Sequence, residues 1–72
     1  MKLPQISGIE LIKKLKNFGF VIVRQRGSHI RLEKNILNGT IKITVPNHSN
    51  LKKGTLLHII KDAGLTPEEV LS

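Results

Sequence analysis

Apolar residues recur at helical spacing near both ends of the chain. In the segment 7–19, leucine and phenylalanine side chains fall three or four positions apart, which predicts an amphipathic helix. Ser7 and Glu10 have the spacing of a capping box at its start, and a glycine is placed to end it. The segment 55–64 has a similar stripe, with Thr55 as the expected N-cap, and predicts a second helix.

Between these helices the pattern changes to that of β-strands. The run 20–25 is rich in β-branched residues, and we expect a strand buried on much of both faces. The segments 29–34 and 40–45 alternate strictly between aliphatic and polar side chains, which predicts two strands with one apolar face each. The pair Asn38-Gly39 between them predicts a hairpin turn.

The predicted order is helix, three strands, helix, with a short helical turn expected after Thr66. Hairpin connections make the strands antiparallel, and the apolar stripe of each helix matches the apolar face of the sheet. The predicted fold class is therefore α+β with two layers, in which both helices cover one face of the sheet and water covers the other. The residues expected on the open face are His29, Arg31, Glu33, Lys42 and Thr44.

The size and composition set limits on the class of protein. With 72 residues the chain is near the lower limit for folding alone, and we expect a single domain over residues 1–72. It has no cysteine, so neither a disulfide nor a thiolate site is expected. No apolar run approaches the roughly 18 residues of a membrane span, and the first residues lack a signal-peptide pattern. We expect an untargeted, cytoplasmic protein that does not act on a membrane.

The net charge points to the kind of partner. The chain has 12 lysines and arginines against 5 acidic residues, which gives a net charge of +7. Such a field favours a polyanion or an acidic protein as the partner. Phe18 and Phe20 are the only aromatic residues, which argues against a protein that stacks bases on aromatic side chains. Contacts with RNA are expected to rely on phosphates, sugars and shape.

The stretch RQRGSHIRL, residues 24–32, contains the main candidate for chemistry. An imidazole can give or take a proton near neutral pH, so an exposed His29 is a candidate general acid or base for RNA cleavage. Neighbouring arginines disfavour its charged form, which leaves it able to accept the proton of a 2′-hydroxyl. The alternative is that His29 is a solvated strand residue. The side chains expected to hold phosphate here are Arg24, Arg26, Arg31 and Lys42.

Further candidates lie in the turns and loops around this stretch. Gly27 and Ser28 would let backbone N–H groups approach a phosphate oxygen. His48 could contact phosphate or supply the second proton-transfer group. Lys52 and Lys53 precede the second helix, where they would add to the positive end of its dipole and bind phosphate. The alternative for all of them is an ordinary solvated surface position.

The third histidine raises the question of a metal. His58 lies on the second helix and is expected at the edge of the core or in solvent. The three histidines are 19 and 10 residues apart, which matches no compact ligand motif, and neither cysteines nor paired carboxylates assist them. We therefore expect no metal and no other cofactor, and with 5 acidic residues we do not expect a carboxylate–magnesium nuclease.

The order of several motifs resembles one protein family. The segments LPQISGIELIKKLKNFGF, RQRGSHIRL, ITVPNH and LKKGTLLHIIKDAGL together resemble the HicA toxins of bacterial and archaeal toxin–antitoxin systems, over nearly the whole chain. The G-S-H triplet, V-P-x-H and K-K-G-T-L in this order are specific together, although each alone is common. The resemblance implies a double-stranded-RNA-binding-like α-β-β-β-α fold and a HicB-type antitoxin as partner.

The same resemblance implies an activity. It implies an mRNA interferase, the toxin of a type II system, that cleaves mRNA without the ribosome, with His29 at the position assigned to catalysis. Two other hypotheses stay open: a non-catalytic RNA-binding module with the same fold, and a protein-interaction domain whose charge serves only an acidic partner. Incubation with RNA in the presence of a chelator separates the three, because the nuclease cleaves RNA, the module only retains it, and the interaction domain does neither.

Overall fold

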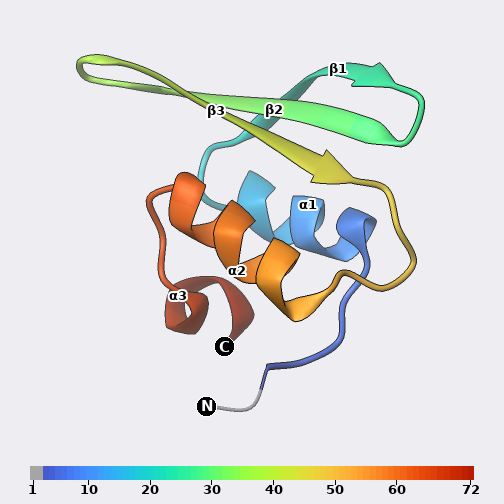
Figure 1. Ribbon diagram of the computed structural model, residues 1–72. Helices are drawn as coiled ribbons and strands as arrows, with labels where there is room; N and C mark the ends of the chain where they lie inside the picture. The colour runs from blue at the N-terminus through green and yellow to red at the C-terminus, as the bar shows by residue number, and fades with distance from the viewer. Residues whose placement is uncertain (1–2) are drawn as a thin grey trace.

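The chain folds into a three-stranded sheet with its helices on one side of it (Figure 1). The computed structural model describes residues 3–72. Within these residues, no helix combines the length and the apolar character needed to cross a bilayer. The elements are α1 (Gly8–Lys16), β1 (Val21–Arg26), β2 (His29–Ile36), β3 (Gly39–Pro46), α2 (Lys53–Asp62) and α3 (Pro67–Leu71).

The sheet has the order β1-β2-β3, and both pairs of neighbouring strands are antiparallel. β2 and β3 form a hairpin whose far end projects beyond the helices (Figure 1). Its turn is one residue earlier than the Asn38-Gly39 pair suggested: Ile36 pairs with Gly39, so Leu37 and Asn38 form the loop. Gly39 carries the positive φ of +153°, whereas the two loop residues keep negative φ.

The core lies between the sheet and the two longer helices. β2 and β3 contribute alternate aliphatic side chains, and α1 and α2 contribute the apolar stripes predicted from their spacing. α3 packs against α1 and α2 on the side away from the sheet (Figure 1). The α+β class and the α-β-β-β-α order are therefore confirmed. The largest fully buried side chains are Phe20, Leu11, Leu15, Leu32, Leu56, Ile60 and Val45.

The ends of α1 follow the predicted signals. The Ser7 hydroxyl accepts from the Glu10 backbone N–H at 3.1 Å, and the Glu10 carboxylate accepts from the Ser7 N–H at 3.1 Å. The bond from the Ser7 backbone N–H, followed by the interaction with the Ser7 side chain, holds the pKa of the Glu10 carboxyl below its usual value. After the helix, Gly19 takes φ +96°, which turns the chain into β1 and directs Phe20 into the core.

The start of α2 differs from the prediction. Lys52, not Thr55, is the N-cap residue, and it caps no N–H group with its side chain. The helix begins earlier because Leu51 and Leu56 are both buried, which draws the preceding backbone onto the core. Thr55 therefore lies inside the first turn. The end of the helix is as predicted, with Gly64 in the left-handed region at φ +76°.

The prediction that β1 is buried on much of both faces is wrong. All six residues of the strand are exposed, including Val21 at 57%, Ile22 at 45% and Val23 at 48%. The physical reason is position: α1 and α2 pack beneath β3, at the opposite edge of the sheet from β1. The pairing with β2 also shifts between Ile22 and Arg24, which leaves Val23 as the extra residue of a bulge.

A close backbone contact fixes α1 to the end of β3. The Gly8 N–H donates to the His48 carbonyl at 2.9 Å, and a Cβ atom at Gly8 would overlap the Pro46 carbonyl oxygen. Pro46 in turn pairs with His29, the first residue of β2. The absence of a side chain at Gly8 therefore sets the distance between the helix and the end of the sheet that carries His29.

We expect Gly8→Ala to destabilise the protein by about 1–3 kcal/mol, because the added methyl group can be accommodated only by moving backbone. Gly54→Ala is the matched control, since nothing lies within 4 Å of a Cβ atom at that helical position. The control should leave the free energy of unfolding unchanged or raise it by up to about 1 kcal/mol. Urea unfolding of both variants measures the difference. Equal stability of the two variants would show that the Gly8 contact is dispensable.

Candidate functional site

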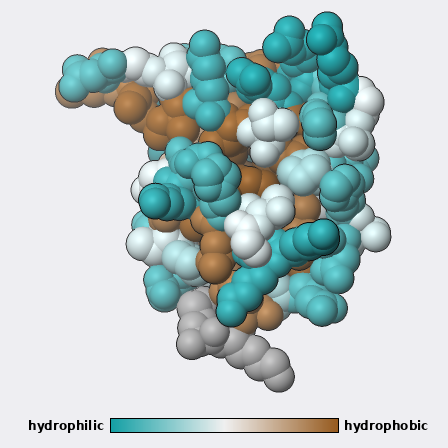
Figure 2. Space-filling model, in the orientation of Figure 1, coloured by the Kyte–Doolittle hydropathy of each residue, from teal (hydrophilic) through white to brown (hydrophobic). Residues whose placement is uncertain are grey.

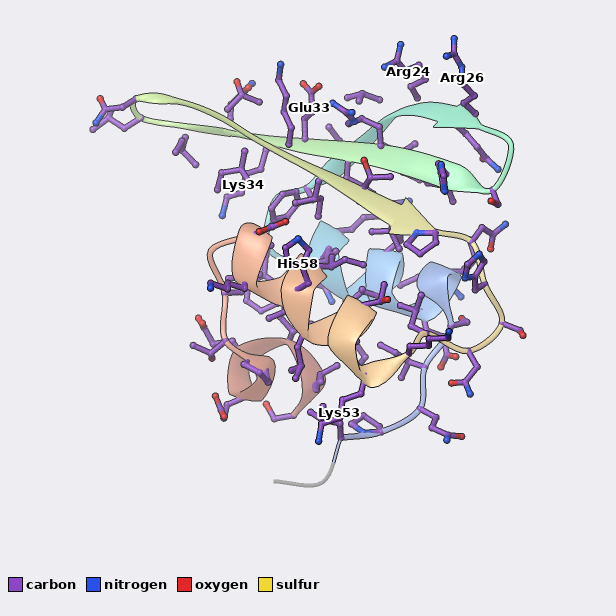
Figure 3. All side chains as sticks on the ribbon, in the orientation of Figure 1. Arg24, Arg26, Glu33, Lys34, Lys53 and His58 are labelled. Carbon is purple, nitrogen blue, oxygen red and sulfur yellow. The ribbon has the colours of Figure 1, made fainter. Side chains whose placement is uncertain are left out.

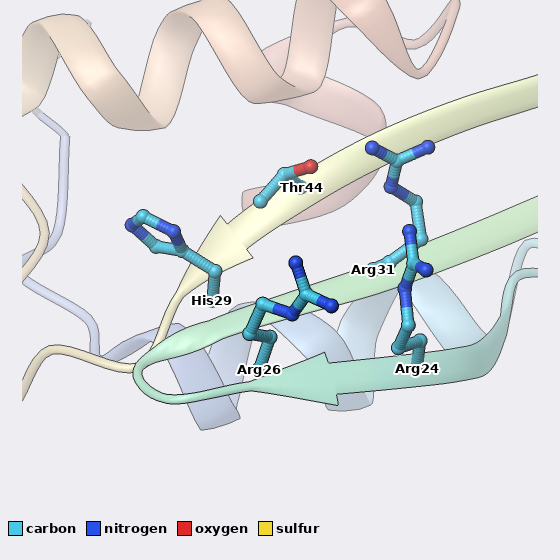
Figure 4. Close-up of a pocket in the computed structure, with 5 residues that line it drawn as sticks. All are labelled: Arg24, Arg26, His29, Arg31 and Thr44. Atoms are coloured by element: carbon cyan, nitrogen blue, oxygen red, sulfur yellow. The ribbon is translucent and has the colours of Figure 1, made fainter.

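An open hollow lies on the face of the sheet that no helix covers. It has a volume of about 170 Å³, and we call it the arginine hollow (Figure 4). Figure 4 shows the guanidinium groups of two neighbouring strands and the imidazole of His29 standing on the same side of the sheet. The residues that line it are Arg24, Arg26, His29, Arg31 and Thr44.

Strand register brings these side chains together. Arg26 of β1 lies directly opposite His29 of β2, and Arg24 lies opposite Arg31. Thr44 of β3 lies opposite Arg31 on its other side. Side chains at directly opposed positions point to the same face of a sheet, so the burial of the intervening Ile30 forces the whole set outward. The cluster is therefore a consequence of the core pattern.

The arginines stand without acidic partners. Within residues 3–72, none of the three guanidinium groups has a carboxylate within 4 Å; the one ion pair found there joins His58 and Asp62 on α2. Like charges directly opposite each other destabilise a sheet. Arg24 and Arg31 break that rule, and a local rule broken without internal compensation is typical of a site that binds an external ligand. The ligand that such a site favours is an anion.

The turn between β1 and β2 directly precedes His29 at one end of the hollow. Gly27 has φ +59°, and no atom lies within 4 Å of the position that a Cβ would take there. The Ser28 carbonyl accepts from the Asn47 N–H at 2.6 Å, which ties this turn to the chain leaving β3. His29 follows directly and is exposed. Gly27 and Ser28 directly precede His29 but are not among the residues that line the arginine hollow, and their contact with a phosphate stays a prediction.

The other candidates lie outside the arginine hollow. Lys42 shares the open face but lies opposite Glu33, farther along the sheet. His48 is an exposed loop residue. Lys52 and Lys53 line a separate hollow with residues 3–5, and Figure 3 shows Lys53 at the end of the molecule opposite Arg24 and Arg26. The structure therefore does not bring the two lysines to His29.

The third histidine is apart from this cluster as well. His58 lies on α2 with 73% of its side chain exposed, and its Nε2 atom is 3.0 Å from Oδ2 of Asp62 (Figure 3). This agrees with the solvent-facing position expected for it. In the described part of the chain, no three histidine, cysteine, aspartate or glutamate side chains lie close enough to hold a metal ion together.

Sequence reasoning did not include Thr44 among the site residues. The alternation of β3 already predicted that Thr44 points to the open face. What the sequence lacked was the register, which sets Thr44 beside Arg31 rather than beside another residue of β2. Figure 2 shows hydrophilic residues over the part of the molecule that carries Arg24 and Arg26 in Figure 3.

Comparison with known proteins identifies the family. The model of the HicA toxin of bacterial toxin–antitoxin systems matches residues 8–65, which include all three strands, α1 and α2. A comparison with curated proteins gave no match. The matched segment contains every residue of the arginine hollow and covers more than half of the chain, and a toxin of this kind implies an antitoxin partner. The chain therefore belongs to the HicA toxin family.

Proposed function

We propose that this toxin is an mRNA interferase, an endoribonuclease that cleaves mRNA without a metal ion and without the ribosome. The observation that carries the proposal is an exposed imidazole beside three guanidinium groups that lack acidic partners in residues 3–72. Membership of the HicA family supports a toxic role. A strong positive charge supports binding to RNA, because a net charge of +7 attracts a polyanion of any sequence.

The proposed reaction is an internal transfer at one phosphodiester bond. The 2′-oxygen attacks the adjacent phosphorus while His29 removes its proton, and the bond from phosphorus to the 5′-oxygen breaks. The 5′-oxygen takes a proton from water as it leaves, and protonated His29 then returns its proton to water, so the products are a 2′,3′-cyclic phosphate and a 5′-hydroxyl. Arg24, Arg26 and Arg31 hold the phosphate and stabilise the negative charge that grows on its oxygens. Ser28 and Lys42 are proposed as further phosphate contacts.

A HicB-type antitoxin is the proposed partner. An inhibitor of this site has to cover His29, which lies on an open sheet face rather than in a cleft. The unpaired arginines favour a surface that carries carboxylates over the arginine hollow. Association with such a partner should be steered by the positive field and should slow as the salt concentration rises.

One observation favours a second function. His29 is the only histidine that lines the arginine hollow, and the other lining side chains are three arginines and a threonine, so no second general acid or base accompanies it there. A domain with this surface and no chemistry would bind RNA through its phosphates and leave it intact. A non-catalytic RNA-binding module is therefore the alternative to the nuclease.

His29→Ala separates the two functions. We expect it to reduce cleavage of a defined RNA in chelator by at least about 100-fold, the usual contribution of a general base, while folding and RNA binding persist. His58→Ala is the matched control, because it removes an exposed imidazole that lies outside the hollow. Gel analysis of the RNA and circular dichroism of the variants measure both effects. Full cleavage by His29→Ala would remove the assignment, and intact RNA with the unmodified protein would favour the binding module.

The salt dependence of RNA binding shows which cations form the interface. In the His29→Ala background, Arg24→Gln should lower the slope of log affinity against log salt by about 0.7, the value for one phosphate contact on single-stranded RNA. Lys53→Gln removes one positive charge from the opposite end of the molecule and should leave the slope unchanged. Fluorescence anisotropy at several salt concentrations measures both slopes. An equal loss for Lys53→Gln would extend the interface to α2, as the sequence suggested.

A further inference from the structure

A second hollow adjoins the arginine hollow on the same open face of the sheet. Its volume is about 320 Å³, within the roughly 300–1,000 Å³ typical of small-molecule sites. Its lining differs from that of the arginine hollow in chemistry, since it combines apolar walls with one carboxylate and one carboxamide. We call it the valine hollow. The residues that line it are Gly19, Val21, Val23, Glu33 and Asn35.

The carboxylate of the valine hollow has no partner in the described part of the chain. Glu33 is the only acidic residue in the three strands, and the other four acidic residues are in helices. Lys42 lies opposite it on β3, yet within residues 3–72 no ion pair or side-chain hydrogen bond involves Glu33. A lone, half-buried carboxylate on a face that is otherwise cationic repels a phosphate backbone. Its chemistry therefore suits a group that presents N–H donors.

The carboxamide beside it is already oriented. The Asn35 Oδ1 atom accepts a hydrogen bond from the Thr40 hydroxyl at 3.2 Å. That bond occupies the carboxamide oxygen and leaves the two N–H groups of Nδ2 free to donate. The polar side of the valine hollow therefore offers the amino group of Asn35 as a donor beside the Glu33 carboxylate. The two oxygens of that carboxylate can accept two hydrogen bonds side by side.

The apolar side of the hollow accounts for exposed valines that the core does not use. Val21 and Val23 belong to β1 and are 57% and 48% exposed. Alternation along β1 puts both side chains on the open face, where Val21 lies opposite Glu33. Gly19 borders the same hollow with backbone atoms only. A flat heterocycle resting on the two valines would remove their apolar surface from water.

We propose that the valine hollow binds a guanine base of the RNA strand whose phosphate lies in the arginine hollow. The Watson–Crick edge of guanine presents one acceptor, O6, followed by two donors, N1–H and the 2-amino group. Asn35 donates to O6, and the Glu33 carboxylate accepts from both donors. Adenine, cytosine and uracil place an acceptor where one of these donors is needed, or lack the second donor. This inference rests on the proposed function for the position of the strand.

The spacing along β2 fits a phosphate and a neighbouring base. His29, Arg31, Glu33 and Asn35 are successive outward residues of one strand, and outward residues repeat at about 6.6 Å. The phosphate-binding end of this row is thus directly followed by the base-binding end. The RNA strand would run along β2 with its backbone over the arginines and one base turned onto the valines.

Short RNAs test the base preference. The His29→Ala protein prevents cleavage, and the probes are oligouridylates that carry one central guanosine, inosine, adenosine, cytidine or no substitution. We expect the guanosine probe to bind about tenfold more tightly than oligouridylate, the effect of one well-made bidentate pair. Inosine lacks the 2-amino group and should bind less tightly than guanosine. Fluorescence anisotropy measures the dissociation constants.

Glu33→Gln in the same background should reduce the guanosine preference to less than about threefold. The glutamine amide presents one acceptor oxygen and one N–H donor where the carboxylate presents two acceptor oxygens. Glu68→Gln is the matched control: it removes one exposed negative charge from α3 and should strengthen binding to all probes slightly without changing their order.

The outcomes separate this inference from the nuclease proposal. Loss of the guanosine preference in Glu33→Gln, but not in Glu68→Gln, supports the base site. Equal binding of all probes, or an unchanged preference in Glu33→Gln, overturns it. If the unmodified protein leaves RNA intact while the guanosine preference depends on Glu33, the base site stands and the nuclease proposal falls.

Discussion

The burial of one face of β2 and β3 beneath α1 and α2 determines which of their side chains point to the open face. Ile30 and Leu32 are only 2% and 0% exposed, and because side chains alternate along a strand, His29 and Arg31 have to point outward. A slip of one residue would place an arginine in the core and an isoleucine in water. The register that fills the core is therefore the same register that assembles the arginine hollow, and stability and site geometry are set by one constraint.

That constraint forces an unfavourable arrangement that the protein keeps. Directly opposed arginines and a net charge of +7 oppose folding through repulsion, and in a chain of 72 residues the core that offsets them is small. Placing two of the arginines on β1 limits the cost, because an exposed edge strand leaves long side chains free to spread into water. The same charges keep an open edge strand from pairing with another chain. Binding of an anion would relieve the repulsion.

The parts of this structure that follow from the sequence are those governed by local rules. The capping box at Ser7 and the alternation around Ile30 and Ile43 depend only on neighbouring residues, and they gave the elements, the class and the exposed position of His29. The exposure of β1 could not be read in the same way, since its apolar run VIV is equally suited to a buried strand, and only the packing of the helices under β3 decides between them. The bulge at Val23 is also a tertiary feature. Without it, alternation from Val21 would turn Arg24 and Arg26 to the covered face, so the arginine hollow cannot be foreseen from the pattern of β1 alone.

The size of the domain explains why the site is a surface rather than a cleft. A chain this short has enough apolar side chains to cover one face of the sheet, and within residues 3–72 every helix lies on that covered side (Figure 1). No element remains to enclose a substrate from above. A bound strand of RNA would itself form the second wall of the site, with its phosphate drawing the arginines inward and its base excluding water from the valines. The substrate would then complete the catalytic geometry. Selectivity among RNA sequences can therefore come from contacts remote from the reacting phosphate.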